Sequence, residues 1–126
     1  MKKRILVVDD DPTSLKTIES MLVSGGYTVK ALSRADDIVR HVQEFTPHLI
    51  VLDFIMPQVD GNQAVKKVKK DPMVSGVPII FLTALKMRDE DRGVDLDINV
   101  DGVSYPTLTK PVDLKTLIAE IERLAK

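Results

Sequence analysis

The sequence contains no cysteine, no long apolar run and no excess of charge of either sign. Without cysteine, neither a disulfide framework nor thiolate-bound zinc is available, which fits a reducing compartment. The 18 basic residues are matched by 19 acidic ones, so no overall basic field favours nucleic acid or an anionic membrane. No run approaches the roughly 18 apolar residues of a membrane span. The basic start is followed by only Ile5 to Val8, too short for a signal peptide.

These absences leave a cytoplasmic, soluble protein with no predicted membrane or direct nucleic-acid partner. A chain of 126 residues is long enough for one hydrophobic core without a structural metal. No repeat, low-complexity tract or linker divides it, so residues 1–126 are predicted to form a single domain.

Short apolar runs that end at polar or turn residues predict the strands. Such runs are typical of strands buried on both faces of a parallel sheet. A Pro-flanked strand is tolerated at a sheet edge. The predicted strands are Ile5–Val8, Tyr27–Leu32, Leu49–Leu52, Val77–Leu82 and a fifth, edge strand at Thr107–Thr109.

Helices are predicted between these strands from apolar residues at helical spacing and from their caps. Asp11 followed by Pro12 marks one start, and Asp60 and Asp113 cap two others. Ser33 with Asp36 resembles a capping box before a helix that ends at Thr46, ahead of a proline. Strands that alternate with helices along the whole chain predict an α/β fold with a doubly wound parallel sheet.

The segment between Thr83 and Lys110 departs from this alternation. A short helix is predicted from roughly Leu85 to Arg92. Beyond it, apolar and polar residues alternate up to Asp101-Gly102, a favoured two-residue hairpin turn, so an extra β-hairpin is expected between the fourth and fifth strands. An EF-hand reading of the same residues fails, because the required glycine position is Val100.

Polar side chains follow several predicted strands at the edge of the sheet where ligands bind in open α/β folds. Asp9 and Asp10 follow the first strand, Asp53 the third and Thr83 the fourth, while Lys110 follows the edge strand. Clustered carboxylates repel one another unless a cation intervenes, and carboxylate oxygens with waters suit Mg²⁺. A metal and Lys110 would neutralise phosphate oxygens, and a carboxylate in such a site can act as the nucleophile.

The ordered motifs resemble the receiver domain of two-component response regulators. They are Val-Val-Asp9-Asp10-Asp11-Pro12, Leu-Asp53-Phe-Ile-Met-Pro-Gln-Val-Asp-Gly61, Phe-Leu-Thr83-Ala and Lys110-Pro111, and they span nearly the whole chain. The resemblance implies a flavodoxin-like sheet of order 2-1-3-4-5. It further implies a stand-alone switch whose Asp53 accepts phosphate from a histidine kinase or phosphotransfer protein and acts on a downstream target.

The resemblance also assigns roles within the site. Asp10 and Asp53 would bind Mg²⁺ directly, with Asp9 through water and the Ile55 carbonyl as a backbone ligand. Lys110 would pair with the phosphoryl group of the aspartyl phosphate, and its bond to Pro111 would be cis as in relatives. Thr83 would move toward the phosphoryl group and alter the surface formed by the fourth helix, fifth strand and fifth helix.

Three features depart from the family pattern. The insertion at residues 94–106 lengthens the segment before the lysine, and Thr107 stands where an aromatic switch residue is usual. Tyr105 is a candidate replacement for that aromatic, and a packing role is the alternative. Ile55 and Leu85 are apolar at positions where rapidly hydrolysing relatives carry polar groups, so slow autodephosphorylation is expected.

Two other classes of function remain open. One is a magnesium-dependent phosphohydrolase with an aspartyl nucleophile, although such enzymes usually place a second Asp where this chain has Ile55. The other is a docking module that acts without phosphorylation, which would not need the acidic set, Thr83 and Lys110. The sequence therefore favours a switch that modifies only itself over an enzyme with a separate substrate.

Overall fold

A computed structural model describes residues 2–54, 56, 59–84, 88–89, 94–95 and 97–125, and its centre is a five-stranded parallel sheet of order β2-β1-β3-β4-β9. The strands of this sheet are β1 (Arg4–Val8), β2 (Thr28–Leu32), β3 (Leu49–Asp53), β4 (Ile79–Thr83) and β9 (Thr107–Thr109). This order confirms the predicted flavodoxin-like arrangement, because β9 is the fifth strand of the sheet along the chain.

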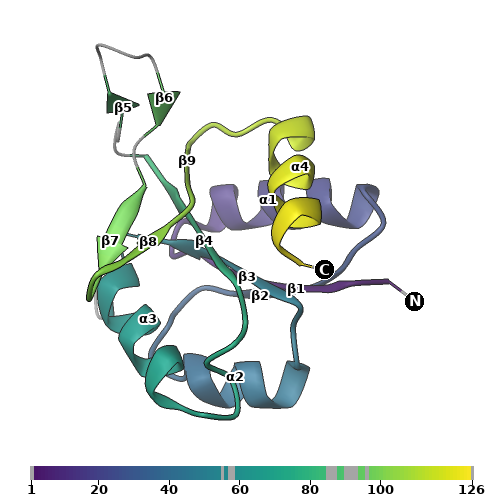
Figure 1. Ribbon diagram of the computed structural model, residues 1–126. Coiled ribbons are helices and arrows are strands. Elements are labelled where there is room, and N and C mark those ends of the chain that lie inside the picture. Colours follow the sequence, from purple (N-terminus) through teal and green to yellow (C-terminus); the bar gives the residue numbers. More distant parts are fainter. Residues whose placement is uncertain are drawn as a thin grey trace.

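Among the described residues, two helices cover each face of the sheet (Figure 1). The pair α1 (Pro12–Ser24) and α4 (Leu114–Leu124) lies on one face, and α2 (Ile38–Phe45) with α3 (Gly61–Lys70) lies on the other. Successive side chains of a strand point to opposite faces, and the core divides accordingly. Leu6 and Phe81 pack with α2 and α3, whereas Ile5 and Leu82 pack with α1 and α4. None of the helices in the described part of the chain is long and apolar enough to span a membrane.

The helix starts follow the predicted caps with one exception. Asp11, Asp60 and Asp113 each accept a backbone N–H of their helix's first turn, and Asp60 forms a full capping box with Gln63. The predicted Ser33–Asp36 capping box is wrong. The N-cap residue of α2 is Asp37, which makes no side-chain cap hydrogen bond. Asp36, the predicted partner of Ser33, instead binds the guanidinium of Arg34 at 3.2 Å.

The predicted helix from Leu85 to Arg92 is wrong at its described residues. Arg88 and Asp89 form β5 (Arg88–Asp89), which pairs antiparallel with β6 (Val94–Asp95), and the rest of that range lies outside the described residues. A helix of about eight residues has little stability of its own, so local strand pairing prevails over helix propensity. The resemblance leads us to expect a helix between β4 and the last strand of the sheet, as part of the surface that changes on phosphorylation. In the described part of this segment, strands take the place of that helix.

The predicted hairpin is confirmed as β7 (Ile98–Val100) paired with β8 (Val103–Tyr105). Its two turn residues have positive φ, 52° at Asp101 and 83° at Gly102, as a type I′ turn requires. The hairpin buries Ile98, Val100 and Tyr105 in the core cluster on the α2–α3 side. It lies beside α3, whereas β5 and β6 project beyond the sheet (Figure 1).

Tyr105 and Thr107 attach this hairpin to the sheet. The Tyr105 ring meets the Phe81 ring edge-on, with 5.8 Å between their centroids. The Thr107 hydroxyl accepts the Ile98 N–H at 3.1 Å and donates to the Tyr105 carbonyl at 3.1 Å. Thr107, at the position where the resemblance leads us to expect an aromatic residue, therefore provides a buried hydroxyl that joins β9 to the hairpin, and Tyr105 packs against Phe81 in the core.

Candidate functional site

Strand register brings Asp9 and Asp53 together at the carboxyl edge of the sheet. Val8 of β1 pairs with Leu52 of β3, so the two aspartates that follow these residues are neighbours. Both are buried, with exposed fractions of 1% for Asp9 and 7% for Asp53. Burial of two carboxylates side by side is unfavourable unless positive charge or hydrogen-bond donors accompany them.

Thr83 and Lys110 reach the same edge from β4 and from the end of β9. Thr83 pairs with Thr109 across the two strands, and the Lys110 backbone N–H donates to the Thr83 carbonyl at 2.8 Å. Thr83 is buried, with 1% of its surface exposed. Thr83 and Lys110, which lie 27 positions apart in the sequence, are thus in direct backbone contact. The peptide bond between Lys110 and Pro111 is cis, as expected.

Lys110 supplies positive charge to the two buried carboxylates. Its Nζ lies 2.6 Å from Oδ2 of Asp9 and 3.6 Å from Oδ2 of Asp53. Burial lowers the pKa of Lys110, but the hydrogen bond to Asp9 and the charges of both aspartates outweigh it and hold that pKa above its usual value. The lysine therefore stays cationic within the site.

Asp9 is held as a carboxylate by several donors. Burial raises the pKa of Asp9, but hydrogen bonds from Lys110, the Asp11 backbone N–H and the Ser14 hydroxyl, with the Lys110 charge, lower it below its usual value. Ser14 was not predicted as a site residue. It lies in the first turn of α1, where a serine in the sequence carries no signal beyond that of an ordinary helix residue.

Carboxylate oxygens of Asp9, Asp10 and Asp53 all lie within 4.8 Å of one another, so these residues could hold a metal ion. An all-oxygen donor set suits a hard divalent cation such as Mg²⁺, which keeps several waters and binds through one or two carboxylates. The residues present therefore fit the predicted metal. The Ile55 carbonyl, the fourth predicted ligand, lies outside the described residues.

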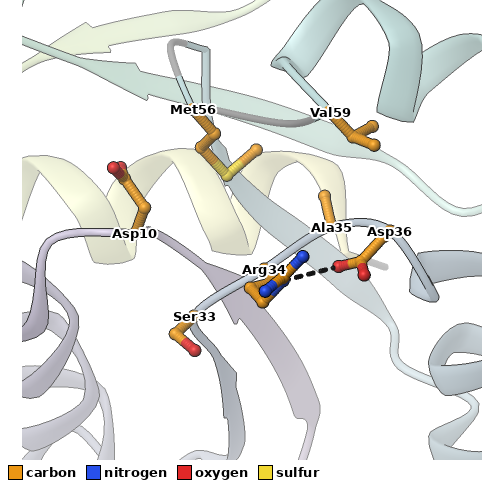
Figure 2. A pocket seen from close by; sticks show the side chains of 7 residues that line it. All are labelled: Asp10, Ser33, Arg34, Ala35, Asp36, Met56 and Val59. Atoms are coloured by element: carbon orange, nitrogen blue, oxygen red, sulfur yellow. Dashed lines mark hydrogen bonds and ion pairs between the residues drawn. The ribbon is translucent and has the colours of Figure 1, made fainter.

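Asp10 is the exposed member of this acidic cluster and borders a small cavity (Figure 2). The cavity has a volume of about 180 Å³ and lies between the β2–α2 loop and the loop after β3. Met56 and Val59 line one side of the cavity, and the β2–α2 loop lines the other. In that loop Arg34 forms an ion pair with Asp36. The cavity leaves the Asp10 side of the cluster accessible to a hydrated cation.

Gly61 fixes the backbone directly after the Asp53 strand. Its N–H donates to the Phe54 carbonyl at 2.7 Å. A Cβ at this position would lie 2.7 Å from the Phe54 Cα and 2.8 Å from Cε1 of Phe81. Only glycine fits at this close approach, so the Asp-Gly pair that closes the motif sets both the α3 cap and the position of the residue after Asp53.

The structure thus brings together five of the predicted site residues: Asp9, Asp10, Asp53, Thr83 and Lys110. They form an acidic cluster with a partly buried lysine and a buried threonine at the carboxyl edge of a flavodoxin-like sheet. Ile55 and Leu85, on which the expectation of slow autodephosphorylation depends, lie outside the described residues.

Comparison with known proteins assigns this architecture to a family. Residues 5–122 match the model of the response regulator receiver domain. The chain belongs to this family and is a receiver domain of the two-component signalling class, a signalling switch.

The relatives include proteins of similar and of greater length. Protein PilH of Pseudomonas aeruginosa is 32% identical over 94% of this chain and 93% of its own. The phosphate regulon transcriptional regulatory protein PhoB of Escherichia coli is 31% identical, and this chain spans 53% of its length.

Solved structures agree on the fold. The receiver domain of the sensor histidine kinase PA1611 from Pseudomonas aeruginosa PAO1, with a magnesium ion in its active site cleft, has a TM-score of 0.81. It is 26% identical, and the alignment covers 99% of this chain and 98% of that one. The chemotaxis protein CheY4 of Vibrio cholerae, 21% identical with a TM-score of 0.79, shares the fold over 98% of this chain and 99% of its own.

Proposed function

We propose that this receiver domain is a phosphoacceptor switch in which Asp53 takes a phosphoryl group from the phosphohistidine of a histidine kinase or phosphotransfer protein. The observation that carries the proposal is the position of Asp53. It lies within reach of two other carboxylates and 3.6 Å from the Lys110 ammonium, at the edge of the sheet where ligands bind. The proposal places the chain in the cytoplasm with protein partners, and assigns it no direct contact with nucleic acid or membrane.

The transfer step exchanges one bond to phosphorus for another. An oxygen of the Asp53 carboxylate forms the new O–P bond as the N–P bond to the donor imidazole breaks. The electron pair of the broken bond stays on the nitrogen, and a ring protonated on its second nitrogen departs as neutral imidazole. The product is an aspartyl phosphate, and charge is conserved across the step.

Lys110 and Thr83 stabilise the transferred group. The phosphoryl oxygens bring negative charge next to a site that already contains carboxylates, so a fixed cation is needed. Lys110 meets that need because its Nζ already lies between Asp9 and Asp53. The Thr83 hydroxyl donates to a phosphoryl oxygen, and the resulting movement at the end of β4 begins the change of state.

Asp9 and Asp10, with Asp53, would hold Mg²⁺, and the Ile55 carbonyl would complete the protein ligands. Bound Mg²⁺ neutralises developing charge on the phosphoryl oxygens. The hydrogen bonds to Asp9 keep this carboxylate in the ionised form that binds a cation.

We further infer that the aspartyl phosphate hydrolyses slowly. Ile55 and Leu85 are apolar at the two positions from which a polar side chain would orient the attacking water. In a chase after labelling, Ile55→Asn and Leu85→Gln should each shorten the phosphoryl lifetime. Loss of label within seconds from the unaltered protein would contradict the inference.

Labelling with acetyl phosphate and Mg²⁺ tests the proposal. The unaltered chain should gain one phosphoryl group by mass spectrometry, and Asp53→Ala should gain none. Asp36→Ala removes a carboxylate outside the acidic cluster and should label normally. Retained labelling of the Asp53 variant would refute the assignment, and multiple turnover of small phosphomonoesters would favour a phosphohydrolase instead.

A further inference from the structure

A groove between α3 and the β7–β8 hairpin takes no part in the chemistry at Asp53. The hairpin and α3 lie side by side at one end of the molecule (Figure 1). The cavity between them has a volume of about 350 Å³. Its lining residues are Val65, Lys66, Lys69, Val100, Asp101, Val103 and Tyr105.

The groove has an apolar floor and an exposed apolar rim. Val65, Val100 and Tyr105 are at most 7% exposed and form the floor. Val103 on β8 is 52% exposed, a high value for a valine within a strand. Val103 therefore extends the apolar floor of the groove to the surface, where Lys66 and Lys69 of α3 also line it.

The charge around the groove is positive. The α3 sequence GNQAVKKVKK holds four lysines and no acidic residue. Lys66 has a long ion pair of 3.8 Å with Asp101 across the groove. Within the described part of the chain, no carboxylate pairs with Lys69, whose Nζ donates to the carbonyls of Ser75 and Val77 at 2.8 and 3.2 Å.

Lys69 differs from the other lysines of α3 in the position of its ammonium group. Lys67 and Lys70 are exposed near the end of α3, where cations are favourable for the helix dipole, and need no partner. The Lys69 ammonium is instead drawn inward, 5.9 Å from the centre of the Tyr105 ring, and burial lowers its pKa. A carboxylate brought to the groove would compensate this partly desolvated charge.

We propose that this groove docks an acidic segment of a partner protein, with an apolar side chain against Val103 and Tyr105 and carboxylates facing Lys66 and Lys69. The apolar floor requires an apolar group that a polyanion such as nucleic acid does not offer. The lysines disfavour a second copy of the same positively charged face, because like charges would be brought together.

The groove is connected to the phosphorylation site by aromatic contacts. Tyr105 packs edge-on against Phe81 at 5.8 Å, and Phe81 packs edge-on against Phe54 at 5.2 Å. Phe54 directly follows Asp53. Docking should therefore respond to the state of Asp53, a part of the inference that rests on the proposed function.

The probe for docking is a phage-displayed library of random twelve-residue peptides selected against the full chain. Selected peptides should combine Asp or Glu with large apolar residues. A synthetic, fluorescently labelled copy of the most enriched peptide is then titrated against variants, and anisotropy gives the dissociation constant.

Matched substitutions locate the binding site. Val103→Asp and Lys66→Glu should each weaken binding by about tenfold, the size of effect expected at a central interface residue. Val23→Asp is the control for Val103, because Val23 is 55% exposed on α1. Lys115→Glu, exposed on α4, is the control for Lys66. Thermal melting establishes that all four variants are folded.

Three other results would overturn the proposal. Failure to enrich any peptide, or enrichment of basic or uncharged ones, excludes an acidic partner segment. Loss of binding with Lys66→Glu but not with Val103→Asp indicates a polyanion. Concentration-dependent self-association that Val103→Asp abolishes indicates a second copy of this chain as the occupant.

The coupling is measured with beryllofluoride and Mg²⁺, which mimic the phosphoryl group on a carboxylate. Peptide affinity should change at least threefold on loading, and Phe81→Leu should reduce that change while leaving labelling of Asp53 by acetyl phosphate in place. An unchanged affinity in a chain that labels normally refutes the coupling. A chain that does not label, yet still binds the peptide through Val103 and Lys66, refutes the proposed function and leaves the docking site standing.

Discussion

The Lys110 ammonium lies 2.6 Å from Oδ2 of Asp9, a contact between residues 101 positions apart that joins the first strand to the last. Only 2% of the Asp9 side chain and 19% of the Lys110 side chain are exposed, so little water screens the pair. Removal of one partner from a buried pair leaves an uncompensated charge, which is more costly than the pair itself is favourable. In this site the stranded charge would be carboxylate, the form that a metal ion binds.

Lys110→Met should therefore make the stability of the protein depend more strongly on Mg²⁺. Without the metal, we expect a loss of about 2 kcal/mol or more in the free energy of unfolding, because Asp9 loses its cation. With Mg²⁺, the variant should recover more stability than the unaltered protein gains, because no ammonium competes with the metal. Denaturant unfolding with and without Mg²⁺ measures both effects, and Lys115→Met is the exposed control. Equal gains in the two proteins would contradict the expectation.

Gly61→Ala should destabilise the fold and impair labelling of Asp53. The added Cβ would meet the Phe54 backbone at 2.7 Å and the Phe81 ring at 2.8 Å, and the backbone side of that contact cannot move aside easily. Overpacking of this kind costs about 1–3 kcal/mol. Gly76→Ala has open space around its Cβ and should change stability by less than about 0.5 kcal/mol. If urea midpoints show Gly61→Ala to be as stable as Gly76→Ala, the close approach is absent.

Gly102→Ala should weaken the hairpin without affecting the chemistry. Gly102 has a φ of 83°, and a side chain in this region costs about 1–2 kcal/mol although nothing lies within 4 Å of its Cβ. Hydrogen exchange at the amides of β7 and β8 should accelerate, while acetyl phosphate still labels Asp53. Faster exchange throughout the central sheet instead would mean that the hairpin does not open as a separate unit.

The raised pKa of Tyr27 predicts that the free energy of unfolding falls at alkaline pH. Burial raises the pKa of Tyr27 from 10.0 to about 12. The hydrogen bond from its hydroxyl to Glu122 at 2.8 Å and the negative charge of Glu122 act in the same direction. Between these two values the unfolded chain releases the phenolic proton and the folded chain keeps it, so stability falls as pH rises. Below pH 10 this contribution is fully present. Tyr27→Phe should be less stable near pH 8, and its stability should fall less between pH 10 and 12 than that of the unaltered chain. Parallel slopes would contradict the assignment.

The sequence predicted which residues lie together at this edge of the sheet, because these residues follow strong local signals. Each of Asp9, Asp53 and Thr83 comes at the end of a short apolar run, and a parallel sheet carries all such ends to one edge. These signals place Lys110 and Asp9 at the same edge, but they do not predict the direct contact between the two side chains. That contact depends on strand register, which is set by pairing between segments distant in the sequence.

The segment before the last strand was predicted less well. Arg88 and Asp89 lie in a stretch rich in helix-forming residues, yet antiparallel pairing with Asp95 and Val94 determines their structure. The hairpin that follows was predictable because Asp101-Gly102 is a favoured sequence for a two-residue hairpin turn. The Thr107 hydroxyl, which joins the hairpin to β9, gave no signal in the sequence because its partners are backbone groups.

Backbone hydrogen bonds join β4 to both ends of β9. The Phe81 N–H binds the Pro106 carbonyl at 2.9 Å, and the Lys110 N–H binds the Thr83 carbonyl at 2.8 Å. The segment that leaves β4 and enters β9 therefore starts and ends at fixed points of the sheet that carries Asp53. Any replacement for this segment has two requirements, because it must reach both ends and also fill the core positions of Ile98, Val100 and Tyr105.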